Sequence, residues 1–580
     1  MEQGQVSASL TAAFGQSSAA RLASWLSPLL AVAGLLLYAF TRTANYNGDG
    51  LVYALAIKDA HSANLISPGH LLYGPLNLKL YQLLQALGLG LSPLAVLQWG
   101  NIIVGALSLG LMAAIAVQLL PSRRLALLVA VGFGVSYSFW IQATDAEAYA
   151  SAIMCTLAAT LLLVLAKKYP HRQGRYCLAA GALGGLAILF HISMVLFYPA
   201  ALIGLLFGYK ETSSHRLRRV ALYSMAFLLA GFAPLLITAF TLGNATSFAG
   251  ALAWLGKSSH SASVSLGPKS FIQAGYGVVN SFVFLASLGQ EIQFALADNS
   301  AKSAIASQLM RSQTAPLLSY LTVALLLGVV GWLALRRLHL REGSAYLIFL
   351  IGWIVPFALM GIYYFPSDTE RWVIILPAVW LLIGLAVAAA PANKFSRDIS
   401  VLAVAVILLA LVNGIGAIIP ARNIRQNALY TVVQSIDRSI GEHDLVIIAG
   451  RAWNCDLYLD YFHNQRNHFS LAAATMYTPI DMAALMQSLN DQISQAEKRG
   501  AALWLYGDLR SAGQEEQVWQ RATHINISRE DFLTALGGFT VEQAVAVGPD
   551  EKLYRLKRNT APTRPLELQK TTQPITYFPG

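Results

Sequence analysis

Nine ionisable side chains fall in short segments that adjoin apolar runs, and their types suit transfer of a phosphate-linked group. A carboxylate can take a proton from an acceptor hydroxyl, and a fixed Arg or Lys can stabilise a departing phosphate. Charged side chains at the ends of membrane spans are costly, so each is a functional hypothesis. The nine residues are Asp49, His70, Lys79, Asp145, Glu147, His191, Asp368, Glu370 and Arg371.

Asp49 stands in the segment Asn47-Gly-Asp-Gly, directly after the first apolar run. Our hypothesis is that Asp49 is a general base that deprotonates the acceptor hydroxyl. His70 and Lys79 follow in the same loop, and Arg371 ends the charged turn near residue 368. Arg371, with Lys79, would then neutralise the phosphate that leaves.

Seven of these residues also have a structural interpretation. Asp49 between two glycines suits a turn, and Lys79 and Arg371 suit side chains that extend to the membrane interface. Asp145 and Glu147 suit the first turn of a helix. His70 suits an interfacial site and His191 a hydrogen-bonded packing site, whereas nearby aromatics suit an interfacial belt. Those aromatics are Trp140, Tyr149, Trp353, Tyr363, Tyr364 and Trp372.

The elements that must position these residues are membrane spans. Of the 580 residues, 56% are hydrophobic and only 12% are charged, whereas a soluble domain is about a quarter charged. Repeated apolar runs are long enough to cross about 30 Å of hydrocarbon. We expect a polytopic α-helical protein of about eleven spans, near 22–40, 93–120, 125–143, 148–166, 177–190, 192–208, 220–242, 315–335, 344–363, 372–390 and 399–419.

The net charge of +11 is a topology signal, since it gathers in five short loops between apolar runs. The positive-inside rule makes these loops cytoplasmic. The N-terminal tail, residues 1–21, is then cytoplasmic, and the Asp49 loop, 41–92, lies outside together with loop 243–314. The basic loops lie near residues 121–124, 167–175, 210–219, 336–341 and 394–397.

Three segments outside the spans have helical character. Residues 51–63 and 75–87 are too short or too polar to be confident spans and suit interfacial helices. Residues 271–296 suit an interfacial or re-entrant helix; a twelfth span there would place the later basic loops outside.

A soluble α/β domain is predicted over residues 421–560, outside the membrane. The pattern indicates strands at 445–449 and 501–506, a helix at 481–498 and a hairpin formed by 539–547 and 553–556. Residues 561–580 are rich in Pro and Thr and suit a loose tail. Three scattered cysteines predict no disulfide framework. No Cys and His spacing predicts a metal site, so we assign no metal ligand, although a divalent cation stays open as a cofactor.

Several short motifs resemble the GT-C superfamily of membrane glycosyltransferases, in its protein O-mannosyltransferase-like branch. They are the Asp49 loop, Pro68-Gly-His-Leu-Leu-Tyr, Phe139-Trp-Ile-Gln-Ala-Thr-Asp-Ala-Glu-Ala-Tyr, and Gly185-Leu-Ala-Ile-Leu-Phe-His followed by Pro199. The resemblance covers residues 22–420. Gly48-Asp49-Gly50 replaces an Asp-Glu pair of many relatives, and Ser67-Pro68-Gly69 replaces a double Pro.

The resemblance implies a GT-C-like catalytic module of eleven to thirteen spans. It also implies an inverting transfer at the outer face, from a polyprenyl-phosphate-linked sugar to a hydroxyl of a protein, glycan or lipid. The family's base maps onto Asp49, its His-bearing Pro-Gly segment onto His70, its acidic turn onto Glu147 and its outer His onto His191. Its phosphate-binding Arg is similar to Arg371. Asp145, Asp368 and Glu370 would help to orient substrate.

Three other functions stay open from the sequence. A lipid or glycan transporter or flippase would need broken or charged helices at mid-membrane and often an internal repeat. A glycan polymerase or ligase would use related chemistry on other acceptors. A non-catalytic envelope assembly protein would work through its outer domain. We expect a bacterial plasma membrane and no nucleic-acid partner.

Overall fold

A computed structural model describes most of the chain. The described residues are 25–60, 65–207, 213–256, 267–285, 328, 331, 344–449, 454–465, 467–476, 482–506, 532–534, 536–548, 551–559 and 566. The chain forms two compact units. We call the described residues from Trp25 to Arg422, without Ala44–Leu55, the helical unit. Ala44–Leu55 and the described residues from Asn423 onward form the C-terminal unit.

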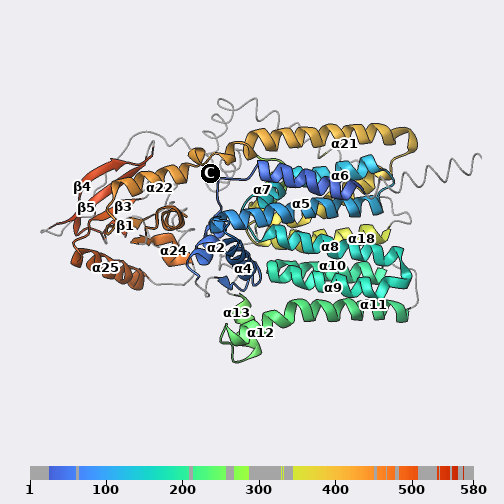
Figure 1. The fold of residues 1–580 in the computed structure, drawn as a ribbon, viewed down its shortest axis with the longest axis horizontal. Coiled ribbons are helices and arrows are strands. Elements are labelled where there is room, and N and C mark those ends of the chain that lie inside the picture. The colour runs from blue at the N-terminus through green and yellow to red at the C-terminus, as the bar shows by residue number, and fades with distance from the viewer. Residues whose placement is uncertain are drawn as a thin grey trace, which may run out of the picture. The chain divides into compact units, whose positions relative to one another are not determined.

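The helical unit is built from apolar helices that run side by side (Figure 1). Among the described residues, six helices are long and apolar enough to cross a membrane, or seven when one bent pair counts as a span. The chain is therefore a mostly helical membrane protein, as predicted. Of the expected span at 315–335 only residues 328 and 331 are described, so the figure of about eleven spans stays a prediction. The six are Pro93–Leu119, Tyr149–Lys168, Ser214–Thr241, Tyr346–Tyr363, Thr369–Ala388 and Asn393–Arg422.

Shorter helices complete this unit. Apolar helices cover Trp25–Phe40 and Ile192–Phe207, and α4 lies where a short interfacial helix was predicted. The labelled helices of the helical unit, long and short, are α4 (Tyr73–Ala86), α5 (Pro93–Leu119), α6 (Arg123–Val135), α7 (Tyr137–Thr144), α8 (Tyr149–Lys168), α9 (Gln173–Phe190), α10 (Phe197–Phe207), α11 (Ser213–Phe227), α12 (Ala233–Thr241), α13 (Phe248–Gly256), α14 (Pro268–Phe282), α18 (Ser344–Tyr363), α19 (Thr369–Trp372), α20 (Leu376–Ala388) and α21 (Ala392–Asn413). Of the segment predicted to be interfacial, 271–285 is described and is largely α14.

The span predicted at 125–143 is not one straight helix. It breaks at Ser136 into α6 and α7, which meet at 64°. Two buried side chains bond to the chain there: Trp380 Nε1 donates to Ser136 Oγ at 3.0 Å, and Asn413 Nδ2 donates to Val135 O at 2.8 Å. The bond from Asn413 gives the Val135 carbonyl a partner where the helix is broken. The bend directs α7 and the acidic turn after it.

Glycine lets α9 lie close to α11. A Cβ added at Gly181 would stand 2.2 Å from the backbone oxygen of Tyr223. Small residues at such contacts allow two membrane helices to approach through their backbones. The sequence shows these glycines, but only the structure identifies the partner helix.

We expect Gly181→Ala to destabilise the helical unit by about 1–3 kcal/mol, because a Cβ would force two backbones apart. The melting temperature of the purified protein in detergent measures this. Gly174→Ala on the same helix is the control, since its Cβ would meet only a Leu222 methyl at 3.4 Å. Equal melting temperatures for the two variants would contradict the expectation.

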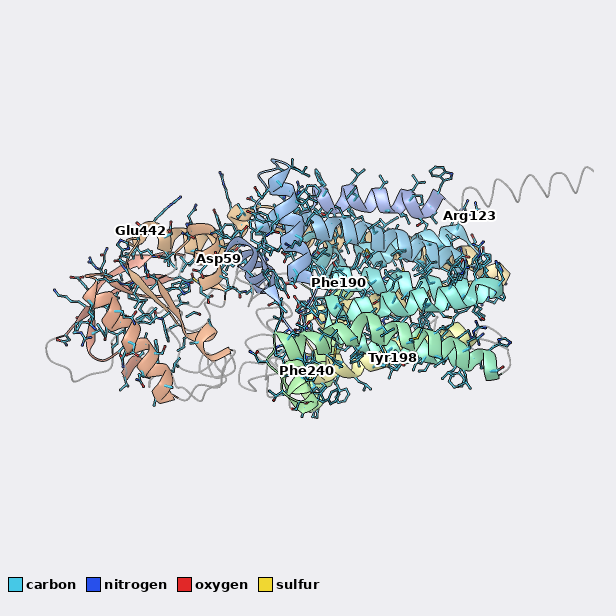
Figure 2. The ribbon with its side chains drawn as sticks, turned by 60° about the horizontal axis from the view of Figure 1, so that its bottom comes forward. Asp59, Arg123, Phe190, Tyr198, Phe240 and Glu442 are labelled. Atoms are coloured by element: carbon cyan, nitrogen blue, oxygen red, sulfur yellow. The ribbon has the colours of Figure 1, made fainter. Side chains whose placement is uncertain are left out.

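The two ends of the helical unit carry different residues. In Figure 2, Arg123 lies at one end of the bundle and Phe190 toward the other. Arg123 begins α6, and Lys167 and Lys168 end α8, so these basic residues share one end of the antiparallel helices. The turns that follow α7 and α9 lie at the opposite end, where Asp145 and His191 are found.

The C-terminal unit contains a five-stranded sheet in the order β2-β1-β3-β5-β4. The strands are β1 (Leu445–Ile448), β2 (His468–Ser470), β3 (Leu503–Tyr506), β4 (Phe539–Ala546) and β5 (Lys552–Arg558). β1 pairs in parallel with β2 and β3, and β5 pairs antiparallel with β3 and β4. The two strands, the helix and the hairpin predicted here are confirmed. The helices are α2 (Gly48–Lys58, shared with the helical unit), α22 (Ala428–Ser439), α23 (Cys455–Tyr458), α24 (Leu471–Met476) and α25 (Met482–Lys498).

Candidate functional site

The acidic turn between α7 and α8 is held by two amide side chains of α5. Asn101 Nδ2 donates to the backbone oxygens of Asp145 at 2.8 Å and Glu147 at 2.6 Å. Gln98 Nε2 donates to Thr144 O at 3.3 Å. Asp145 and Glu147 are each only 2% exposed. Asp145 Oδ1 accepts from the Ala146 N–H, and no side chain caps α8, so the helix-capping interpretation of these acids is wrong.

The second charged turn precedes α20. Asp368 caps α19 by accepting the N–H of Glu370 at 3.0 Å, and its other oxygen lies 3.4 Å from Arg371 Nε. Ser138 Oγ on α7 donates to Thr369 O at 2.9 Å, which ties this turn to the bent span. The guanidinium also lies 5.0 Å from the centre of the Tyr364 ring. The turn therefore holds Arg371 in a fixed place, with its side chain 17% exposed.

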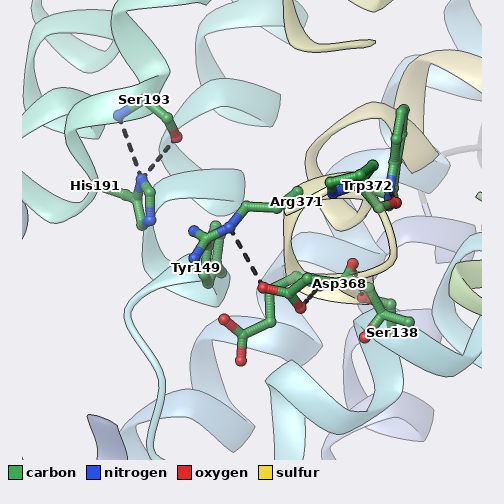
Figure 3. A network of polar contacts seen from close by, with 10 residues as sticks. Ser138, Tyr149, His191, Ser193, Asp368, Arg371 and Trp372 are labelled. Atoms are coloured by element: carbon green, nitrogen blue, oxygen red, sulfur yellow. Dashed lines mark hydrogen bonds and ion pairs between the residues drawn. The ribbon is translucent and has the colours of Figure 1, made fainter. Parts of the chain in front are cut away.

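A row of rings leads from Arg371 to the two histidines. Arg371 Nη1 donates to the Tyr149 hydroxyl, and the Tyr149 ring lies 4.1 Å from the His191 ring between centroids. His191 in turn meets His70 edge-to-face at 4.7 Å. Figure 3 shows Arg371, Tyr149 and His191 turned toward one another. Four segments far apart in the sequence thus meet at one place.

Ser193 fixes the proton position on His191. The Ser193 N–H and hydroxyl lie 3.3 and 2.6 Å from His191 Nδ1. A backbone N–H can only donate, so Nδ1 is the acceptor and a neutral ring carries its proton on Nε2. His191 therefore has an N–H that can donate to a substrate oxygen.

His70 is attached to the end of α9. Its Nδ1 lies 3.1 Å from Phe190 O, and Leu72 N donates to Leu189 O at 2.8 Å. Ile192 N donates to Gly69 O at 2.9 Å. The Pro-Gly-His segment is thus a docked turn, and both histidines are placed by the same helix end.

Burial lowers the pKa of His191, and charge on His70 and Arg371 lowers it further. An unfolded chain binds a proton at this residue near pH 6.5, whereas the folded protein keeps His191 neutral to lower pH. The folded state therefore loses stability as pH falls below about 6.5. We expect the melting temperature to fall more steeply for wild type than for His191→Gln between about pH 7 and pH 5. Parallel curves would contradict this.

The structure brings together some of the predicted residues and not others. His70, His191, Asp368 and Arg371 join one network, and Asp145, Glu147 and Glu370 lie in the two turns beside it. Lys79 is exposed on α4, where it donates to Gln82 at 3.1 Å. Asp49 is half-buried in the first turn of α2 and belongs to the C-terminal unit.

Sequence reasoning missed Tyr149, Ser193 and Asn101. Tyr149 was assigned to an interfacial belt, but it is 2% exposed. The belt assignment is also wrong for Trp140, Trp353 and Trp372, which are buried in the protein. Two amides three residues apart in an apolar helix, Gln98 and Asn101, were a usable signal, since buried amides need polar partners.

Comparisons with known proteins agree with this architecture. Residues 80–238 match the family described as dolichyl-phosphate-mannose-protein mannosyltransferase. The fold is similar to ArnT from Cupriavidus metallidurans bound to undecaprenyl phosphate, with a TM-score of 0.54 and 12% identity over 92% of this chain and 97% of that chain. It is also similar to the apo oligosaccharyltransferase of Archaeoglobus fulgidus, with a TM-score of 0.50 and 12% identity over 93% of this chain and 74% of that chain. No curated protein matches the sequence.

Proposed function

We propose that this chain is a membrane glycosyltransferase of the GT-C superfamily, and that it moves a sugar from a polyprenyl-phosphate-linked donor to an acceptor hydroxyl; the fold similarity to ArnT and the family match support this. The proposal depends mainly on one observation: the Arg371 side chain is largely buried, and Tyr149 and Asp368 hold its guanidinium in place. A guanidinium has five N–H groups, more than these two partners use, and its planar fork suits phosphate. The undecaprenyl phosphate bound to ArnT supports a lipid phosphate as the ligand.

The proposed step is a direct displacement. Asp49 takes the proton of the acceptor hydroxyl, the oxygen bonds to the anomeric carbon, and the bond from that carbon to the phosphate oxygen breaks. The configuration at the carbon inverts, and polyprenyl phosphate leaves with the bonding electrons. Arg371 neutralises the phosphate. Lys79 is the weaker phosphate candidate, because its amino group is exposed and bonds to Gln82.

The remaining residues are assigned to substrate orientation. The Nε2–H of His191 is available for a sugar or phosphate oxygen, and His70 packs against that ring. Asp145, Glu147, Asp368 and Glu370 would hold sugar hydroxyls or the backbone that carries Arg371. Among the described residues, no group of three or more His, Cys, Asp or Glu side chains is arranged to hold a metal ion.

The proposal also includes an orientation of the protein across the membrane. The candidate site and the basic residues Arg123 and Lys168 lie at opposite ends of the helices. With the basic end in the cytoplasm, the site faces outward and the N-terminus lies inside. We propose the bacterial plasma membrane as the location and an acceptor on its outer face.

The test is sugar transfer by purified protein in lipid vesicles. Synthetic polyprenyl-phosphate sugars are supplied singly, with polyprenyl phosphomannose first because the matched family uses a mannosyl lipid. Release of polyprenyl phosphate and labelling of an acceptor are measured together. We expect one donor to be consumed, and its sugar names the specificity. If a full donor panel gives no release, the proposal is wrong.

A lipid flippase is the second candidate. The bent pair α6–α7 favours it, since broken spans are common where transporters bind substrate. The same vesicles discriminate the two functions when they carry a fluorescent polyprenyl phosphate. Movement of this lipid between leaflets without release of phosphate from any donor would favour the flippase.

A further inference from the structure

The segment that carries Asp49 is packed as part of the C-terminal unit. Ala44–Leu55 clusters with residues from Asn423 onward rather than with the helices that flank it in sequence. Asp49 lies near the middle of this segment, in the first turn of α2. The contacts of Ala44–Leu55 therefore determine the position of the Asp49 carboxylate.

Tyr458 forms hydrogen bonds with the backbone of Tyr46, three residues before Asp49. Its hydroxyl donates to Tyr46 O at 3.1 Å and accepts from Tyr46 N at 3.2 Å. It also accepts from Asn427 Nδ2 at 2.8 Å. One hydrogen and two lone pairs are thus all used, and Tyr458 is only 1% exposed. A buried and fully satisfied hydroxyl of this kind fixes one backbone geometry.

Asn427 forms a further hydrogen bond with the same segment, at Ala44. Its Nδ2 donates to Ala44 O at 3.1 Å as well as to Tyr458, while its Oδ1 accepts from Tyr430 N and caps α22. The same side chain therefore joins the start of a helix in the C-terminal unit to the start of the Asp49 segment. Every polar atom of this buried amide has a partner.

Two further contacts involve Tyr46 and Gly48. The Tyr46 ring packs on Phe462, 5.7 Å away between centroids. At Gly48, an added Cβ would stand 2.4 Å from the Asn454 side chain, which contacts the chain one residue before Asp49. Ala44, Tyr46 and Gly48 are thus all contacted by residues between Asn427 and Phe462.

From these contacts we infer that Tyr458 and Asn427 are positioning residues, through which the C-terminal unit sets the place of the Asp49 carboxylate. The inference rests on the proposed function, in which Asp49 is the base. A general base must lie within hydrogen-bond reach of its proton, and a shift of about 1 Å can cost about a hundredfold in rate.

Tyr458→Phe is the direct test, because it removes the hydroxyl and keeps the ring. We expect kcat for sugar transfer to fall at least tenfold while KM for the donor stays the same. Hydrogen exchange of the peptide covering residues 44–51 should become faster. Tyr430→Phe is the matched control, since its ring packs on Phe462 in the same cluster, whereas the hydrogen bonds to Tyr46 are made by Tyr458.

A double mutant separates positioning from simple loss of stability. If Tyr458 acts through Asp49, adding Tyr458→Phe to Asp49→Asn lowers the residual rate no further. Independent, multiplied losses would overturn the inference, and so would a Tyr458→Phe rate equal to that of Tyr430→Phe. A wild type that transfers no sugar from any donor instead removes the proposed function, and this inference with it.

Discussion

Asp49→Asn is expected to lower sugar transfer by a factor of about 10²–10⁴, the range that a positioned acid or base contributes. The amide has the shape of the acid but cannot accept the proton of the acceptor hydroxyl. Asp49 lies in the first turn of α2, where helix N–H groups favour a negative charge. The measurement is kcat in vesicles with the donor that the wild type consumes.

Asp59→Asn is the control for this variant. Asp59 directly follows the same helix and is exposed, so it reports the general effect of removing an acid there. Both variants should insert and melt like the wild type, because neither changes side-chain size. If Asp49→Asn keeps the rate of Asp59→Asn, Asp49 is not the base, and Glu147 or another acid of the two turns must be tested in its place.

The helices were predictable because a membrane span is a local property. About twenty consecutive apolar residues suffice to cross the bilayer, and α5, α8 and α18 lie where those runs occur. The alternating and apolar patterns of β1, β3 and the β4–β5 hairpin are equally local. In each case the residues that decide the element lie inside it.

The break at Ser136 was not predictable from its own segment. The residues that bond there, Trp380 and Asn413, lie 244 and 278 positions away in sequence. Without them, an apolar run of this length indicates one straight span. The sequence marks Ser136 and Ser138 as polar, but it does not identify their partners.

The candidate site likewise contains contacts that are local in sequence and contacts between distant segments. The Asp368–Arg371 pair is local, since residues three apart in a turn or helix meet. The row from Tyr149 through His191 to His70 joins three separate segments, and one sequence alone does not show which rings meet. The segment that carries Asp49 bonds to Tyr458, which is 412 residues from Tyr46. The types of residue in the candidate site could therefore be predicted from the sequence, whereas their proximity to one another could not.

Arg371→Gln is expected to lower transfer by about 10²–10³, because it removes the group that we propose to neutralise the leaving phosphate. Only 17% of the arginine side chain and 33% of the Asp368 side chain are exposed, so water screens this charge weakly. Binding of polyprenyl phosphate should weaken in parallel, since product and leaving group carry the same phosphate. Arg397→Gln is the matched control, on an arginine that is 66% exposed near the basic end of the bundle.

Arg371→Lys and Tyr149→Phe separate charge from geometry. A lysine keeps the charge but loses the planar fork that contacts both Tyr149 and Asp368, so we expect an activity between wild type and Arg371→Gln. Tyr149→Phe keeps Arg371 but removes the hydroxyl that accepts a hydrogen bond from its guanidinium. We therefore expect the rate of transfer to fall less than in either arginine variant. If all three variants bind polyprenyl phosphate and transfer sugar as Arg397→Gln does, the phosphate lies elsewhere. The network of Arg371, Tyr149 and His191 would then be structural, and the rings between Arg371 and His70 would serve only to join the ends of the helices.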